Sequence, residues 1–197
     1  MDTHRSGAEQ SSNTTRALIE RLSQTLGVPE LRCGTQILRN QKGWRDDEIE
    51  VDYLWYALVM PSFHPRAAIG MAHMDESEFR GKKHPAVIRA AVVISDRGKD
   101  QVGSSTFAEV TEDPLVEAIR GVELLPENRS LCLDGICYEL RTSGWEIDAT
   151  LRIRNPQTAT LRAIEQSLFQ VVSTVQKQTG NDKIAAYLNS WQEYLKR

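Results

Sequence analysis

The hydrophobic positions of the chain are most regular in its last third, after the Asn155-Pro156 pair. Apolar residues recur there every three or four positions, which is the spacing of a helix with one buried face. Gly180 divides the pattern in two, because glycine commonly ends a helix, and Asn181 or Asp182 suits the N-cap of the next one. The first stripe consists of Leu161, Ile164, Leu168, Val171, Val172 and Val175, and the second of Ile184, Tyr187, Leu188, Trp191 and Leu195. The pattern predicts two C-terminal helices, each with an apolar face to bury.

A pattern with period two precedes these helices. Residues 130–133 and 136–142 flank the Asp134-Gly135 pair, which supplies the positive φ angles of a two-residue hairpin turn. Residues 145–154 alternate between apolar and polar side chains, as expected of a third strand. The inward positions of the hairpin are Leu131, Leu133, Ile136, Tyr138 and Leu140, whereas Cys132 and Cys137 stand opposite each other on the outward face. We therefore expect a three-stranded antiparallel meander whose dry face the two helices cover.

Three more segments have the β-branched and aromatic content of strands. Residues 49–60 begin with alternation and become apolar on both faces, as expected in the middle of a sheet, and residues 86–95 form a second buried run. Residues 105–110 form a shorter one. Residues 66–85 have no clear period, so the pattern favours a short helix or an irregular loop there.

The N-terminal region is polar at first. Residues 1–13 have no repeating apolar position and are expected to be a disordered tail. From Asn13, a suitable N-cap, apolar residues at helical spacing predict an amphipathic helix. Asp113 followed by Pro114 predicts a further short helix. Together these patterns predict a single α+β domain over residues 14–197, in which helices cover an antiparallel sheet of central strands and the C-terminal meander.

Composition and charge narrow the classes of function. The chain has 24 basic and 27 acidic residues and a formal net charge of −3, so it lacks the overall positive charge that gathers nucleic acid. No apolar run is long enough to span a membrane, and the first residues lack the apolar stretch of a signal peptide. Three cysteines in 197 residues do not make a disulfide scaffold. We therefore expect a cytoplasmic protein with no cofactor, no nucleic-acid partner and no membrane contact.

The densest group of charges lies between residues 46 and 52. It consists of Asp46, Asp47, Glu48, Glu50 and Asp52, and Trp44 precedes it. These carboxylates repel one another, and a cation or a basic protein surface would relieve the repulsion. On the alternating part of the strand, Glu48, Glu50 and Asp52 project from one face. The simpler interpretation is a solvated acidic strand edge that resists aggregation.

The opposed Cys132 and Cys137 are a candidate redox pair. A disulfide between directly opposed residues would close a very small loop and add little stability. Reactivity requires a lowered thiol pKa, and Arg141 is the only obvious cation nearby in the sequence. Two small side chains tolerated on a sheet surface are the simpler interpretation.

Three histidines, His64, His73 and His84, give a weaker indication of metal chemistry. Asp75 and Glu76 lie near them in the sequence, but the spacings match no compact ligand motif. The chain has no phosphate-binding loop, no dinucleotide-binding glycine motif and no nucleophile elbow. We assign no metal site and no catalytic residue, and keep a metal-dependent hydrolase that uses the clustered acids and histidines as an alternative.

The sequence favours a non-enzymatic protein that binds another protein with a basic surface, such as an inhibitor or immunity-type partner of a basic enzyme. The carboxylates of residues 46–52 would speed the encounter, and Trp44 would supply buried apolar area, since tryptophan is common among binding hot spots. A third alternative is a homo-oligomeric structural protein whose outward sheet face, bearing Arg141, Arg152 and Arg154, pairs with acids of another copy.

Overall fold

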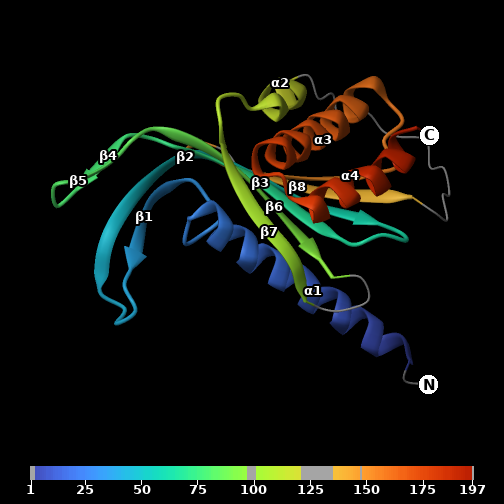
Figure 1. Cartoon of the computed structure of the whole chain (residues 1–197), viewed down its shortest axis with the longest axis horizontal. Coiled ribbons are helices and arrows are strands. Elements are labelled where there is room, and N and C mark those ends of the chain that lie inside the picture. Colours follow the sequence, from blue (N-terminus) through green and yellow to red (C-terminus); the bar gives the residue numbers. More distant parts are fainter. Residues whose placement is uncertain (1–2, 97–100, 121–134, 147, 197) are drawn as a thin grey trace.

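An antiparallel sheet separates the N-terminal helix from the three later helices (Figure 1). The computed structural model describes residues 3–96, 101–120, 135–146 and 148–196. The elements in chain order are α1 (Thr3–Leu26), β1 (Gly34–Arg39), β2 (Arg45–Pro61), β3 (Ala67–Met74), β4 (Ser77–Phe79), β5 (Lys82–His84), β6 (Val87–Ser95), β7 (Val102–Val110), α2 (Pro114–Arg120), β8 (Ile136–Gly144), β9 (Asp148–Arg154), α3 (Ala159–Thr179) and α4 (Asp182–Leu195). The strand order is β7-β6-β3-β2-β8-β9, with β1 paired to the first part of β2. The expected α+β fold with two C-terminal helices is confirmed.

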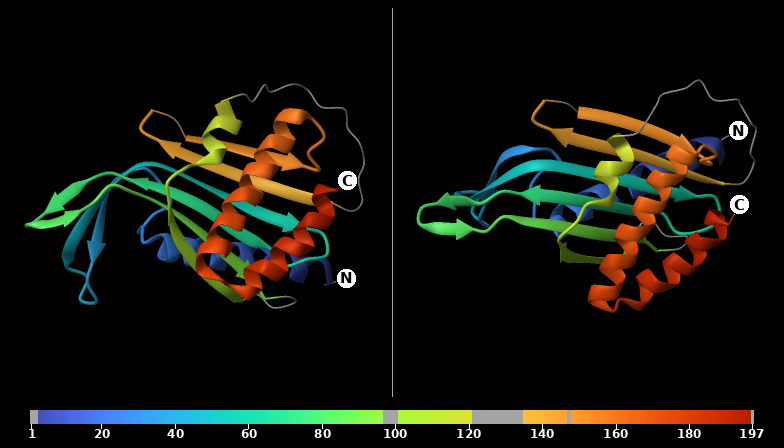
Figure 2. Two further views of the ribbon diagram at one scale, coloured as in Figure 1. Left: turned by 45° about the horizontal axis from the view of Figure 1, so that its top comes forward. Right: turned by 90° about the horizontal axis from the view of Figure 1, so that it is seen from above.

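The helices α2, α3 and α4 lie on one face of the sheet (Figure 2). They bury an apolar cluster to which β2 contributes Trp55 and α4 contributes Trp191. The boundary between α3 and α4 follows the prediction: Gly180 ends α3 in the left-handed conformation at φ 64°, and the Asn181 side chain accepts hydrogen bonds from the first backbone N–H groups of α4. The two predicted apolar stripes therefore pack on the same side of the sheet.

The inward and outward faces of residues 136–140 are as predicted, but the strand pairing is not. Cys137 of β8 pairs with Met60 of β2 on one side and with Arg154 of β9 on the other, so β2 occupies the edge at which the hairpin pattern predicted residues 130–133. Ile136, Tyr138 and Leu140 of β8 are buried against α3 and α4, whereas Cys137 points to the other face and is only partly buried. Ile153 of β9 is buried on the same side as the inward residues of β8. The first strand of the predicted hairpin, with Leu131, Cys132, Leu133 and the Asp134 turn position, lies outside the described residues.

The helix α1 covers the opposite face of the sheet, and its apolar residues Leu18, Leu22 and Leu26 are buried there. The helix begins at Thr3, so the structure has helix over most of residues 1–13, where the apolar pattern predicted a disordered tail. Helical hydrogen bonding needs no apolar face, and a polar segment can continue a helix whose later turns are packed. None of the described helices is long and apolar enough to cross a membrane.

The segment of residues 66–85 contains strands, and the expected short helix or irregular loop is absent from it. β3 pairs with β2 on one side and with β6 on the other, and its first six residues are all buried. A strand covered on both faces has no polar alternation, which explains why its pattern was ambiguous. Arg80 and Gly81 connect β4 to β5 and have φ angles of 51° and 82°. Positive φ angles at both positions suit a tight two-residue turn.

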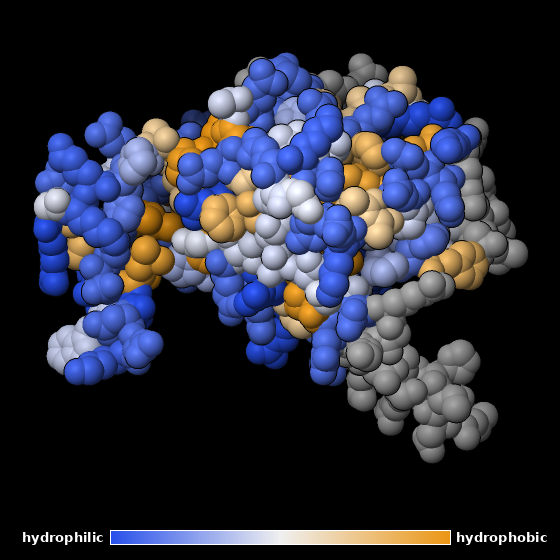
Figure 3. Space-filling view, in the orientation of Figure 1, coloured by the Kyte–Doolittle hydropathy of each residue, from blue (hydrophilic) through white to orange (hydrophobic). Residues whose placement is uncertain are grey.

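The strand β2 is 17 residues long and belongs to two parts of the molecule. Its second half pairs with β3 and β8 in the middle of the sheet, and its first part pairs with β1 from Val51 to Arg45. We call β1, residues 45–52 of β2, and the β4–β5 hairpin the arm, because these elements project from one end of the sheet (Figure 1). The arm is mostly hydrophilic, with apolar residues gathered where it joins the body (Figure 3).

Candidate functional site

Four of the five clustered carboxylates lie on the outer side of the arm. Ile49 and Val51 are buried in the cluster below α1, so the residues that alternate with them face away from it. Asp46 and Asp52 are exposed, and Glu48 and Glu50 are partly exposed. We call Asp46, Glu48, Glu50 and Asp52 the acidic face. The shared orientation of Glu48, Glu50 and Asp52 was predicted from the alternation.

Asp47 is not part of the acidic face, which corrects the expectation that all five carboxylates are available to a partner. It points to the opposite side of β2 and is 1% exposed. Its carboxylate accepts hydrogen bonds from the ammonium group of Lys82 and from Nε2 of His84, the latter at 2.9 Å. The hydrogen bond from Lys82, reinforced by His84, holds the pKa of Asp47 below its usual value. Asp47 therefore anchors the β4–β5 hairpin to β2.

The charge of the acidic face is only partly compensated within the arm. Glu48 forms an ion pair with Arg45. Glu50 accepts a hydrogen bond from the hydroxyl of Thr35 at 2.7 Å, a neutral donor that leaves the charge in place. Within the described residues, no lysine or arginine pairs with Asp46, Glu50 or Asp52. A basic surface would therefore find negative charge without a cationic partner at Asp46, Glu50 and Asp52.

Large apolar side chains are exposed at both ends of the acidic face. Trp44 is 72% exposed at the start of β2, although its backbone is held by Asn40, whose side-chain Oδ1 accepts from the Trp44 N–H at 3.1 Å. Trp145 is 64% exposed, and its indole N–H donates to Asp52 Oδ1 at 3.0 Å. Ile37 of β1 is 39% exposed and lies opposite Glu48 in the register. The sequence singled out Trp44 but not Trp145, which it treated as the first residue of a strand.

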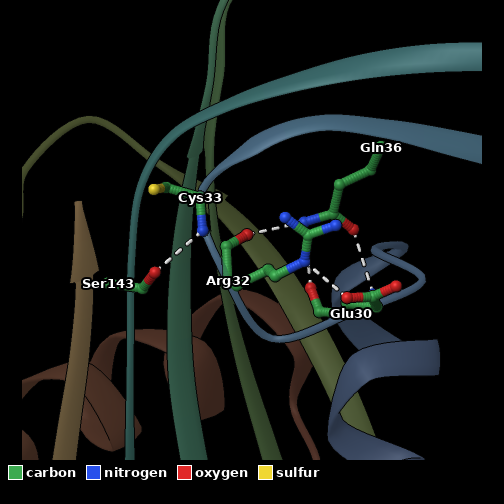
Figure 4. A network of polar contacts seen from close by, with 5 residues as sticks. All are labelled: Glu30, Arg32, Cys33, Gln36 and Ser143. Atoms are coloured by element: carbon green, nitrogen blue, oxygen red, sulfur yellow. Dashed lines mark hydrogen bonds and ion pairs between the residues drawn. The ribbon is translucent and has the colours of Figure 1, made fainter. Parts of the chain in front are cut away.

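The base of the arm is held by a buried polar network (Figure 4). The carboxamide of Gln36, 3% exposed, donates to the backbone carbonyls of Glu30 and Arg32 and accepts from the backbone N–H of Glu30. The backbone N–H of Cys33 donates to Ser143 Oγ at 3.0 Å, which ties the start of β1 to the end of β8. Because these hydrogen bonds are satisfied inside the protein, the arm keeps a defined position relative to β8.

A second polar cluster lies on the same side of the sheet as the C-terminal helices. Asp113, whose side chain is 3% exposed, accepts from the indole N–H of Trp55 at 2.8 Å and from the backbone N–H of Leu115 at 3.0 Å. Its Oδ2 also lies 2.8 Å from Nε2 of His73. Tyr53 stands edge-on to His73 with ring centroids 5.5 Å apart, and burial, together with the charge of Asp113, raises the pKa of Tyr53 to about 12. Asp113, which caps the N-terminus of α2, thus also holds the imidazole ring of His73 in place.

An open cleft of about 470 Å³ adjoins His73. Its lining consists of Asp52, His73, Met74, Asp75, Ala86, Val87, Ile88, Glu109, Val110 and Thr111. Asp52 belongs both to this lining and to the acidic face, so the two features are continuous. No local pattern in the sequence indicates the cleft, because its walls come from strands far apart along the chain.

The histidines do not gather into one site. His73 pairs with Asp113, His84 with Asp47, and His64 lies 3.7 Å from Glu193 in α4. Across residues 3–96, 101–120, 135–146 and 148–196, no group of three or more histidine, cysteine, aspartate or glutamate side chains is placed to hold a metal ion.

Cys137 lacks the environment of a reactive thiol. Burial raises its pKa and outweighs the opposing effect of Arg154 and Arg152. Cys132, the other member of the proposed redox pair, lies outside the described residues. The arginines on this face are also partly compensated, since Arg141 and Arg152 both pair with Glu139.

Comparison of the chain with protein-family models, with curated proteins and with solved structures found no match in any of the three.

Proposed function

We propose that this protein is a cytoplasmic, non-enzymatic binding module that docks a basic protein surface onto the acidic face of its arm. The observation that carries the proposal is the combination of the acidic face with exposed Trp44 and Ile37 on the arm and with exposed Trp145, which follows β8 and contacts Asp52. Exposed tryptophans beside uncompensated charge are typical of an interface, where aromatic anchors supply most of the affinity. An inhibitor or immunity-type partner of a basic enzyme is the class of protein that fits this surface.

The two kinds of side chain have different roles in the proposed complex. The carboxylates attract a basic partner over a distance of roughly one Debye length, about 8 Å at physiological salt, and therefore act mainly on the association rate. Trp44 and Trp145 lose exposed apolar surface on docking and therefore act mainly on the dissociation rate. Trp145 is already oriented by Asp52, so little side-chain entropy is lost there.

The proposal is tested by affinity capture from the native host with the full-length protein immobilised. A captured basic protein is then purified, and its binding is measured at low and raised salt. Trp44→Ala should lower the affinity at least tenfold, as expected of a hot spot. Phe63→Ala is the matched control, because Phe63 is 63% exposed but lies beyond the other end of β2.

The charges are tested in the same complex. Replacing Asp46, Glu48 and Glu50 by their amides should slow association and reduce its salt dependence. A double change of Asp182→Asn and Glu193→Gln in α4 removes acids far along the chain from the arm and should leave the association rate unchanged. Binding that resists Trp44→Ala and is insensitive to salt would overturn the proposal.

A further inference from the structure

The charged side chains that line the cleft beside His73 are all acidic. Its acidic lining residues are Asp52, Asp75 and Glu109, and no lysine or arginine is among the described residues that line it. Glu109 is partly compensated by Arg89, which lies 3.4 Å away. Asp52 accepts only from the neutral indole of Trp145, and Asp75 has no charged partner within the described part of the chain. Two carboxylates that line the cleft thus have no cationic partner among the described residues.

The rest of the lining is apolar or fixed in place. Ile88 and Val110 provide apolar surface from neighbouring strands, because they pair across β6 and β7 and pack on the same side of the sheet. His73 is held by Asp113 through Nε2, and a quarter of its side chain remains exposed. A volume of about 470 Å³ lies within the range of roughly 300–1,000 Å³ that is typical of ligand sites. Apolar walls with two carboxylates and a fixed ring suit an elongated ligand with a cationic end.

A metal ion does not fit this cleft, because the described acids and histidines do not converge on one point. An organic cation needs no such convergence. Guanidinium is planar and more weakly hydrated than ammonium, so it is the cation best suited to a partly enclosed site that offers carboxylates and an aromatic ring. Its alkyl stem can lie along the apolar walls while the charged end meets the carboxylates.

We propose that the cleft receives an arginine side chain of the basic partner. This inference rests on the proposed function and extends it, because Asp52 makes the cleft the continuation of the acidic face. The exposed tryptophans anchor the partner on the arm, and the cleft selects a partner with an arginine at the matching position.

The experiment titrates the full-length protein with N-acetyl-arginine methylamide and follows the imidazole resonances of His73 by NMR. These resonances are assigned by comparison with His73→Gln. The control ligand is N-acetyl-citrulline methylamide, which has nearly the same shape and no charge. A saturable shift with arginine and at least tenfold weaker binding of citrulline are expected.

Two single substitutions locate the binding. Asp75→Asn should weaken arginine binding by about fivefold, the upper range for an exposed ion pair. Glu76→Gln removes the same charge one residue further along, outside the cleft lining, and should change nothing. Equal binding of arginine and citrulline, equal effects of the two substitutions, or tighter binding of the corresponding lysine derivative would overturn the inference. None of these results depends on Trp44, so the proposed docking on the arm is judged separately by the capture experiment.

Discussion

The Asp113 carboxylate is the point at which the sheet, α2 and the cleft are joined, and its removal is the most informative perturbation of stability. Its two oxygens serve three donors: Oδ1 caps α2 at the backbone N–H of Leu115, and Oδ2 meets Trp55 and His73. Asp113→Ala removes all three interactions at once. The cost differs among them because the donors differ in their access to water.

The magnitude follows from those environments. Loss of the N-cap costs about 1 kcal/mol. Trp55 is completely buried, so its indole N–H would be left unsatisfied, at about 1–3 kcal/mol. His73 is a quarter exposed, and water can replace its partner at little cost. We therefore expect Asp113→Ala to lower the free energy of unfolding by about 2–4 kcal/mol. Asp113→Asn should fall between wild type and Asp113→Ala, since one amide oxygen can serve either the cap or the indole but not both.

Urea unfolding followed by circular dichroism measures these differences without relying on tryptophan fluorescence. A double-mutant cycle with Trp55→Phe isolates the buried hydrogen bond, because phenylalanine leaves no donor behind. In the Trp55→Phe protein, Asp113→Ala should lower the free energy of unfolding by only about 1 kcal/mol. The coupling energy between the two substitutions should be about 1–3 kcal/mol. If the two substitutions were additive within about 0.5 kcal/mol, the buried indole would not depend on Asp113 and the reasoning would be refuted.

Three other perturbations test the packing and the buried charges. Gly70→Val should lower the free energy of unfolding by about 1–3 kcal/mol in urea denaturation, because a Cβ at this position would lie only 3.0 Å from Leu22 of α1. Burial raises the pKa of Glu165 above its ordinary 4.5, so the folded state keeps this proton at pH values where the unfolded state has lost it. The free energy of unfolding should therefore fall as pH rises above 4.5. Glu165→Gln should remove this dependence in unfolding curves measured across pH. The pKa of Asp47 is lowered from 3.8, so its contribution to the free energy of unfolding is present above that pH and should be lost as pH falls below it. Backbone hydrogen exchange in β4 and β5 should become faster at that low pH. Asp47→Asn should show the same faster exchange at neutral pH.

Local patterns in the sequence predicted the C-terminal half of the fold well. The helices α3 and α4 have strong periodicity and chemically distinct ends, and both Gly180 and Asn181 have the predicted capping roles. The inward face of β8 followed from alternation about the predicted turn, since one face of that strand meets the helices and the other does not, whereas its pairing with β2 was not predicted. By contrast, β3 is buried on both faces and contains alanine and glycine, so neither period nor propensity identified it as a strand.

The candidate site was only partly predictable for a different reason. Alternation placed Glu48, Glu50 and Asp52 together, because it depends on neighbours in one strand. The contacts of Asp113 span 40 residues to His73 and 58 to Trp55, and no local pattern contains that information. Asp47 belonged to the same acidic run as its neighbours, and only the position of the β4–β5 hairpin shows that it is a buried anchor.

The continuity of β2 has a mechanical consequence. No loop interrupts β2 between the arm and the centre of the sheet, and hydrogen bonds of Gln36 and Cys33 hold the base of the arm near the shift in strand pairing between Val51 and Tyr53. A macromolecule that settles on the arm meets a surface already in its final shape, and complex formation forfeits little backbone freedom. Force exerted on β2 in the arm passes along the strand into the middle of the sheet, and a tight complex should therefore raise the melting temperature of the entire sheet.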